Sequence, residues 1–184
     1  RYFIEVLKIF DSGSLLRRIQ DLSISKIILV VFLSALCARC IYLLFVYTDA
    51  SSLMIEDSNL YLELAETISL HQLANANFNV LFPSTEDMPL YPFFIAWVFS
   101  VFGKSEIILV LLQIIIDSLT CVFVALLAKE LSQRISFFAG IFAALNPTQI
   151  VVSSIILTDS IFLFFITISF YALIKCTKKI FKNH

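Results

Sequence analysis

Charged residues are scarce in this chain of 184 residues. Only 15% of them are Asp, Glu, Lys or Arg, against roughly 25% in soluble domains, while 60% are hydrophobic. The sequence contains no basic cluster interleaved with aromatic residues, so nothing in it suggests a nucleic-acid partner. It also lacks internal repeats, low-complexity tracts and Asn-x-Ser/Thr sequons. This composition argues against a soluble domain.

Cysteine is sparse as well. The four cysteines are Cys37, Cys40, Cys121 and Cys176, and three of them lie inside apolar runs. Cys37 and Cys40 have a CxxC spacing, but small residues on a membrane helix are the simpler interpretation than a metal or redox site. The cysteines therefore predict no disulfide framework.

The sequence has instead four long apolar segments with almost no charge, at residues 26–47, 106–128, 135–154 and 160–174. We interpret them as membrane spans, since about 20 apolar residues cross about 30 Å of hydrocarbon. Asn146-Pro147 predicts a kink in the third span. The apolar stretch at 91–102 is too short to span and predicts a re-entrant or interfacial helix. The expected fold is an all-α, polytopic bundle of about four spans, with short helices in the first outer loop.

The charges between these segments are segregated by sign. Eleven of the 13 basic residues share one side: Arg1, Lys8, Arg17, Arg18, Lys26, Lys129, Arg134, Lys175, Lys178, Lys179 and Lys182. Nine of the 14 acidic residues share the other: Asp49, Glu56, Asp57, Glu63, Glu66, Glu86, Asp87, Glu106 and Asp159. Because basic residues concentrate in cytoplasmic segments, both ends of the chain are predicted to be cytoplasmic and residues 48–105 to lie outside.

Three regions follow along the chain. Residues 1–25 form a cytoplasmic leader, either an amphipathic helix at the inner interface or a solvated segment. Residues 26–175 form the membrane domain, and residues 176–184 a basic cytoplasmic tail. Within the outer loop, a helix is expected up to Leu70, with Asp57 and Ser58 as its candidate N-cap residues. The two ends of the sequence suggest the N-terminal part of a longer protein.

This topology gathers carboxylates at the non-cytoplasmic face. Asp57 follows the first span, and Asp159 lies in the tight turn between the third and fourth spans. Two carboxylates from different loops can hold a base and orient an acceptor or a metal ion. Acidic loops more often simply face water, so both interpretations are open at this point.

Two charged residues lie inside the predicted spans. Arg39 can snorkel towards the headgroups or pair with a carboxylate. Asp117 lies in the middle of its span, where an acid is costly and is a functional candidate. The alternative is that Asp117 faces the bundle and bonds to polar neighbours such as Gln113, Ser118 or Thr120.

Six short motifs occur along the chain: Asp57-x-x-x-Tyr61-x-x-x-Ala65, Met88-Pro89-Leu90-Tyr91-Pro92-Phe93, Val101-Phe102-Gly103, Leu126–Leu131, Leu145-Asn146-Pro147 and Leu157-Thr158-Asp159-Ser160-Ile161-Phe162. In this order and topology, residues 26–175 resemble the N-terminal part of the GT-C membrane glycosyltransferases. The branch is that of the protein O-mannosyltransferases and lipid A aminoarabinose transferases. The resemblance implies an enzyme that takes a sugar from a polyprenyl-phosphate carrier and passes it to a protein, lipid or glycan acceptor at the non-cytoplasmic face. Such enzymes have many more spans, so the 184 residues alone are expected to transfer no sugar.

The resemblance also implies residue roles. Asp57 would be the general base on the acceptor hydroxyl, and Asp159 would shape the active site. Tyr61 would bind the lipid-phosphate donor. The negative charges of the donor phosphate also need a cation, which Arg39 or a loop beyond this chain could supply. Glu86 falls near an acidic position that binds a divalent metal in some members, although Ser58 stands where a second acid often follows the Asp.

Two other classes stay open. One is a non-enzymatic polytopic protein, such as a transporter or an assembly subunit, and the other is an inactive truncated product. A transporter predicts polar residues near the midplane of several spans. Only Gln113 and Asp117 meet that condition here.

Overall fold

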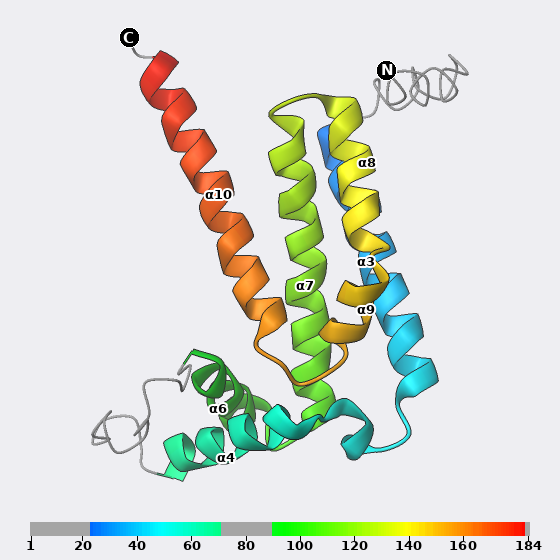
Figure 1. Cartoon of the computed structure of the whole chain (residues 1–184), viewed down its shortest axis with the longest axis vertical. Helices are drawn as coiled ribbons and strands as arrows, with labels where there is room; N and C mark the ends of the chain where they lie inside the picture. Colours follow the sequence, from blue (N-terminus) through cyan, green and yellow to red (C-terminus); the bar gives the residue numbers. More distant parts are fainter. Residues whose placement is uncertain (1–22, 71–89, 183–184) are drawn as a thin grey trace. The chain divides into compact units, whose positions relative to one another are not determined.

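The computed structural model describes residues 23–70 and 90–182 (Figure 1). Its elements are α3 (Ile24–Val46), a 3₁₀ helix (Ala50–Leu53), α4 (Glu56–Leu70), α6 (Leu90–Phe102), α7 (Glu106–Lys129), α8 (Gln133–Ala144), α9 (Pro147–Ser153) and α10 (Asp159–Lys182). Within these residues the chain is entirely helical, which confirms the predicted all-α class. The predicted leader lies almost wholly outside the described residues.

Three of the described helices are long and apolar enough to cross a membrane: α3, α7 and α10 over Asp159–Phe181. Helices α8 and α9 meet the same criterion together, with a bend of 54° between them, and would make a fourth span. Helix α6 has 13 residues and is too short to span. The chain is therefore an integral membrane protein with a helical bundle.

The bend between α8 and α9 falls at Asn146-Pro147, where the sequence predicts a kink. Proline has no N–H to continue a helix, and it disfavours helical geometry in the residue before it. Helix α8 ends at Ala144, and Pro147 is the first residue of α9. Proline is well suited to that first position because its missing N–H would have no partner there.

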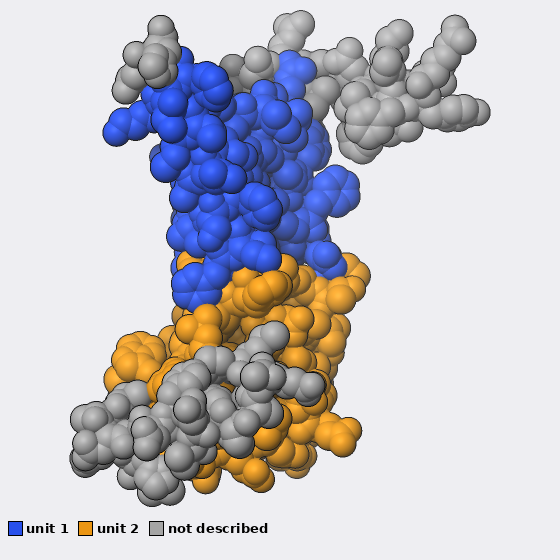
Figure 2. Space-filling view, turned by 60° about the vertical axis from the view of Figure 1, so that its left-hand side comes forward, with its two compact units in different colours: residues 1–38, 118–146, 165–184 blue, residues 39–117, 147–164 orange. Residues whose placement is uncertain are grey.

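The chain divides into two compact units (Figure 2). Unit 1 contains residues 1–38, 118–146 and 165–184, and unit 2 contains residues 39–117 and 147–164. Helices α3, α7 and α10 contribute residues to both.

Unit 1 has its core where α3, α7 and α8 pack together around buried side chains of Ile27, Val31, Ala35, Cys121, Val122, Ala125 and Ala144. Ser136 of α8 donates a hydrogen bond from its hydroxyl to the Ala125 carbonyl of α7 at 2.7 Å. A methyl group at Gly140 would lie 2.6 Å from Val31 Cγ2 and 2.9 Å from Ala125 Cβ. Small residues thus allow the three backbones to approach closely, as is common in membrane helix packing.

Gly140→Ala is expected to destabilise the protein by about 1–3 kcal/mol, the usual cost of overpacking a core. The added methyl would meet Ala125 Cβ, which only a shift of the α7 backbone can move. The thermal unfolding midpoint of the protein in detergent measures the effect. Phe142→Leu, at a side chain that is 76% exposed on the same helix, is the control. An unchanged midpoint for Gly140→Ala would contradict this packing.

Unit 2 has its core where α4 packs against α6. Ala65 and Ile68 of α4 are buried, as are Ile95 and Val98 of α6. Helix α6 ends at Gly103, whose φ of +80° is a left-handed conformation that suits glycine and ends a helix. The following turn leads directly into α7.

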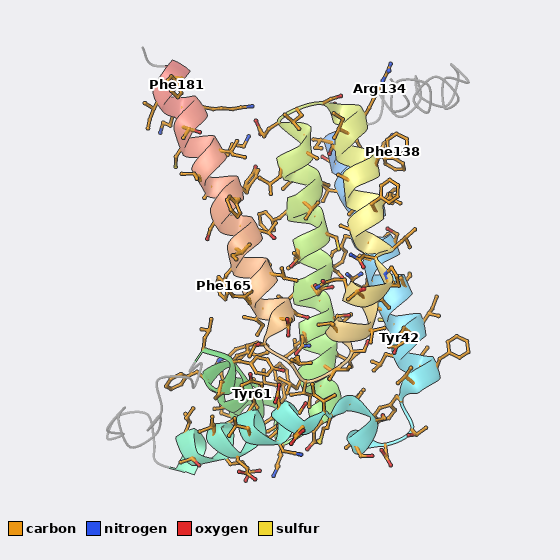
Figure 3. The ribbon with its side chains drawn as sticks, viewed as in Figure 1. Tyr42, Tyr61, Arg134, Phe138, Phe165 and Phe181 are labelled. Atoms are coloured by element: carbon orange, nitrogen blue, oxygen red, sulfur yellow. The ribbon has the colours of Figure 1, made fainter. Side chains whose placement is uncertain are left out.

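Large apolar side chains cover much of the outer surface of these helices. Leu44 and Phe45 of α3 and Phe181 of α10 are each more than 80% exposed. Figure 3 shows Phe181 near the end of α10. Such exposure suits side chains that face lipid, because hydrocarbon tails solvate them as well as a protein core does.

Candidate active site

Asp57 lies in the first turn of α4, which begins at Glu56. The Ser58 hydroxyl accepts a hydrogen bond from the Ile55 N–H at 2.9 Å and donates one to the Ile156 carbonyl at 2.7 Å. Ser58 is therefore buried and holds the start of the helix, whereas the Asp57 side chain is exposed. The prediction that Asp57 or Ser58 is the N-cap residue of α4 is wrong, because the helix begins at Glu56 and both residues lie inside its first turn.

Asp159 is the first residue of α10, and its side chain is also exposed. The turn before it is held by two neighbouring segments. The Ile156 N–H donates to the Leu53 carbonyl at 2.9 Å. Gln113 of α7 donates from Nε2 to the Ile155 carbonyl at 2.7 Å. The backbone that leads into Asp159 is therefore fixed by bonds to buried groups on both sides.

The two predicted carboxylates thus lie on segments that are hydrogen-bonded to each other. The Ile156 N–H donates a hydrogen bond to the Leu53 carbonyl, and the Ile156 carbonyl accepts one from the Ser58 hydroxyl. Asp57 directly precedes Ser58, and Asp159 follows Ile156 by three residues. Both segments belong to unit 2. Hydrogen bonds therefore tie the start of α4, which carries Asp57, to the turn that leads into Asp159.

Tyr91 of α6 lies at the centre of this region and is only 2% exposed. Its hydroxyl donates to Gln113 Oε1 at 2.8 Å. Tyr61, on the side of α4 that faces α6 (Figure 3), meets the Tyr91 ring edge-on at a centroid distance of 5.2 Å. Burial raises the pKa of Tyr91, and nearby Tyr61 and Asp159 raise it further, so the hydroxyl remains a donor. Of the predicted site residues, Tyr61 therefore packs directly against Tyr91.

Arg39 and Asp117 form a buried ion pair between α3 and α7. Arg39 Nε and Nη2 each lie 2.5 Å from Asp117 Oδ2, and Gln149 of α9 donates from Nε2 to Asp117 Oδ1 at 2.5 Å. Neither charged side chain is exposed to solvent. Arg39 is thus paired with a carboxylate, one of the predicted alternatives, and its contact with a donor phosphate stays a prediction. Asp117 faces the bundle as expected, but its partners Arg39 and Gln149 were not predicted.

Glu86, the predicted metal ligand, lies outside the described residues, and its role stays a prediction. Across residues 23–70 and 90–182, no group of three or more His, Cys, Asp or Glu side chains could hold a metal ion.

Neither Tyr91 nor Gln113 was predicted from the sequence as part of the site. A signal for Gln113 was available, because a buried amide in an apolar helix needs hydrogen-bond partners. The partners themselves, Tyr91 and Ile155, lie 22 and 42 residues away, and only the packed structure brings them together.

Comparison with known proteins gives one family match. The model described as dolichyl-phosphate-mannose-protein mannosyltransferase matches residues 86–182. This range contains Tyr91, Gln113 and Asp159, whereas Arg39 and Asp57 precede it. No curated protein and no solved structure matches the chain. The match agrees with the resemblance seen in the order of the motifs, and the helical bundle agrees with a polytopic enzyme. The chain therefore belongs to the dolichyl-phosphate-mannose-protein mannosyltransferase family, and so to the membrane glycosyltransferases of the GT-C type.

Proposed function

We propose that this protein transfers a sugar from a polyprenyl-phosphate-linked donor to a hydroxyl group of a protein, lipid or glycan acceptor at the non-cytoplasmic face. The observation that supports this most directly is the hydrogen-bonded junction between the Asp57 segment and the Asp159 turn. It joins the segment that carries Asp57 to the turn that leads into Asp159, and Asp159 lies inside the family-matched region. Tyr61 and Tyr91 pack beside it.

The reaction needs a base on the acceptor. The acceptor oxygen forms a bond to the anomeric carbon while the bond from that carbon to the phosphate oxygen breaks. The polyprenyl phosphate leaves with that electron pair, and the acceptor hydroxyl loses its proton. Asp57 would take up this proton, because its exposed carboxylate is free of the structural bonds that Ser58 makes. Asp159 would shape the acceptor side of the site, and Tyr61 would contact the donor.

The remaining assignments concern charge on the donor phosphate. Arg39 would offset only part of that charge, because its guanidinium lies 2.5 Å from a carboxylate oxygen of Asp117 and is already largely neutralised by it. Glu86 is the residue that we assign to a divalent metal. We also propose that both ends of the chain lie in the cytoplasm, as the segregation of basic residues indicates.

Sealed membrane vesicles of known orientation test this function and its sidedness together. A labelled polyprenyl-phosphate sugar is incorporated, and label is followed into the protein, lipid and glycan fractions. In the same vesicles an impermeant maleimide probes Cys176, which is exposed near the end of α10. Cys37, Cys40 and Cys121 are replaced by serine, so that Cys176 is the only target.

For the full-length protein, the expected result is transfer of label out of the polyprenyl carrier, together with labelling of Cys176 from the cytoplasmic side only. A cysteine placed at Lys104, in the predicted outer loop, should react only from the opposite side. Retention of all label on the carrier would contradict the proposed transfer. Labelling of Cys176 from outside would contradict the orientation.

A further inference from the structure

Unit 1 contains an open, largely apolar groove formed by α7, α8 and α10. Its volume is about 500 Å³, within the range of small-ligand sites. Leu127 of α7, Ala139 of α8, and Phe170 and Ile174 of α10 contribute to its apolar lining. Its charged lining consists of Glu130 and Lys178. The groove is therefore amphipathic, with a long apolar surface and a charged end.

Basic side chains predominate at this charged end. Lys175 Nζ lies 2.8 Å from Glu130 Oε1, and Lys178 Nζ lies 2.6 Å from Glu130 Oε2. Hydrogen bonds from Lys175 and Lys178 lower the pKa of Glu130 to about 2, so this carboxylate remains charged. One negative charge thus faces two ammonium groups, which are themselves more than half exposed.

Three further basic residues of unit 1 flank this cluster in sequence. Lys129 precedes Glu130, Lys179 follows Lys178, and Arg134 lies in the first turn of α8 (Figure 3). All three side chains are exposed. At the groove itself, two ammonium groups face one carboxylate, so this end of the groove carries a net positive charge.

We propose that this groove binds a phospholipid with an anionic headgroup. Its acyl chain would lie along the apolar lining, and its headgroup would contact Lys175 and Lys178. An apolar groove with basic residues at one end is complementary to an anionic amphiphile, and basic pockets between membrane helices are known to suit such headgroups. A second copy of the chain is a poorer occupant, because it would bring two positive ends together. This inference does not rest on the proposed enzymatic function.

Native mass spectrometry of the purified protein tests the proposal with phosphatidylglycerol and phosphatidylcholine of matched acyl chains. The wild-type protein should retain phosphatidylglycerol about tenfold more strongly, given the attraction of two lysines to an anionic headgroup. The double variant Lys175→Gln/Lys178→Gln should lose this preference. Lys104→Gln is the matched control, because it also removes an exposed lysine from an ion pair, with Glu66, but lies in unit 2.

A second variant tests the contribution of the apolar lining to lipid binding separately from that of the lysines. Ala139→Leu fills the apolar lining without touching the lysines, and it should weaken retention of both lipids while unfolding at a similar temperature in their absence. Equal retention of the two lipids by the wild-type protein would overturn the proposal. So would a stable dimer in place of lipid-bound monomer, or unchanged lipid retention by the Ala139→Leu variant.

Discussion

Asp57→Asn in the full-length protein is expected to lower the rate of sugar transfer by about 10²–10⁴-fold, the usual effect of losing a general base. The amide keeps the shape of the side chain but cannot take up the acceptor proton. The amount of inserted protein should not change, because the Asp57 side chain is exposed and Ser58 makes the bonds that hold this turn. The measurement is the initial rate of label transfer in membranes, normalised to the amount of protein.

Glu63→Gln is the matched control for this substitution. Glu63 is also an exposed acid on α4, and the change removes the same charge. Its rate should stay close to that of the wild type. Asp159→Asn should impair transfer less completely, since Asp159 is assigned to the shape of the site. A near-normal rate for Asp57→Asn would refute the general-base role, and an equal loss for Glu63→Gln would point to the net charge of the helix instead.

The fold was largely predictable because its main determinant is local. A run of apolar residues long enough to cross hydrocarbon predicts a membrane helix, and Pro147 predicts a break wherever it falls. The ends of helices were harder to predict. Helix α10 continues to Lys182, well past residue 174 where the predicted span ends. Lysine is a good helix former, and Lys175 and Lys178 are held by Glu130, so loss of apolar character does not end the helix.

Only those residues of the candidate site that belong to short sequence motifs could be proposed from the sequence. Asp57, Tyr61 and Asp159 were assigned to the site because each stands in a motif whose order along the chain is informative, and their roles stay predictions. The hydrogen bonds that hold these segments in place could not be predicted from the sequence, because they join distant parts of the chain. Ser58, for example, bonds to Ile156, which is 98 residues away. The Arg39–Asp117 pair was missed for the same reason. Each charge is evident in its own span, but their pairing depends on the rotation and depth of α3 against α7.

That pair carries the second large prediction, which concerns stability. Asp117→Leu should destabilise the protein by about 3–5 kcal/mol, the usual cost of breaking a buried ion pair. It leaves the Arg39 guanidinium, which has no solvent exposure, without its carboxylate partner, and arginine cannot shed its proton. Arg39→Met should cost less, because the remaining carboxyl group can take up a proton and keeps its hydrogen bond from Gln149. SDS-driven unfolding in mixed micelles measures both variants.

The double variant Arg39→Met/Asp117→Leu distinguishes a specific pair from two independently useful side chains. The double variant removes both charges, so no buried charge is left without a counter-charge. It should therefore be more stable than Asp117→Leu alone. Lys104→Gln, which breaks the exposed pair with Glu66, should change the unfolding midpoint little. If the losses of the two single substitutions simply add, Arg39 and Asp117 are not coupled. A midpoint for Asp117→Leu equal to that of the wild type would show that the guanidinium reaches water or another acid in the membrane-embedded protein.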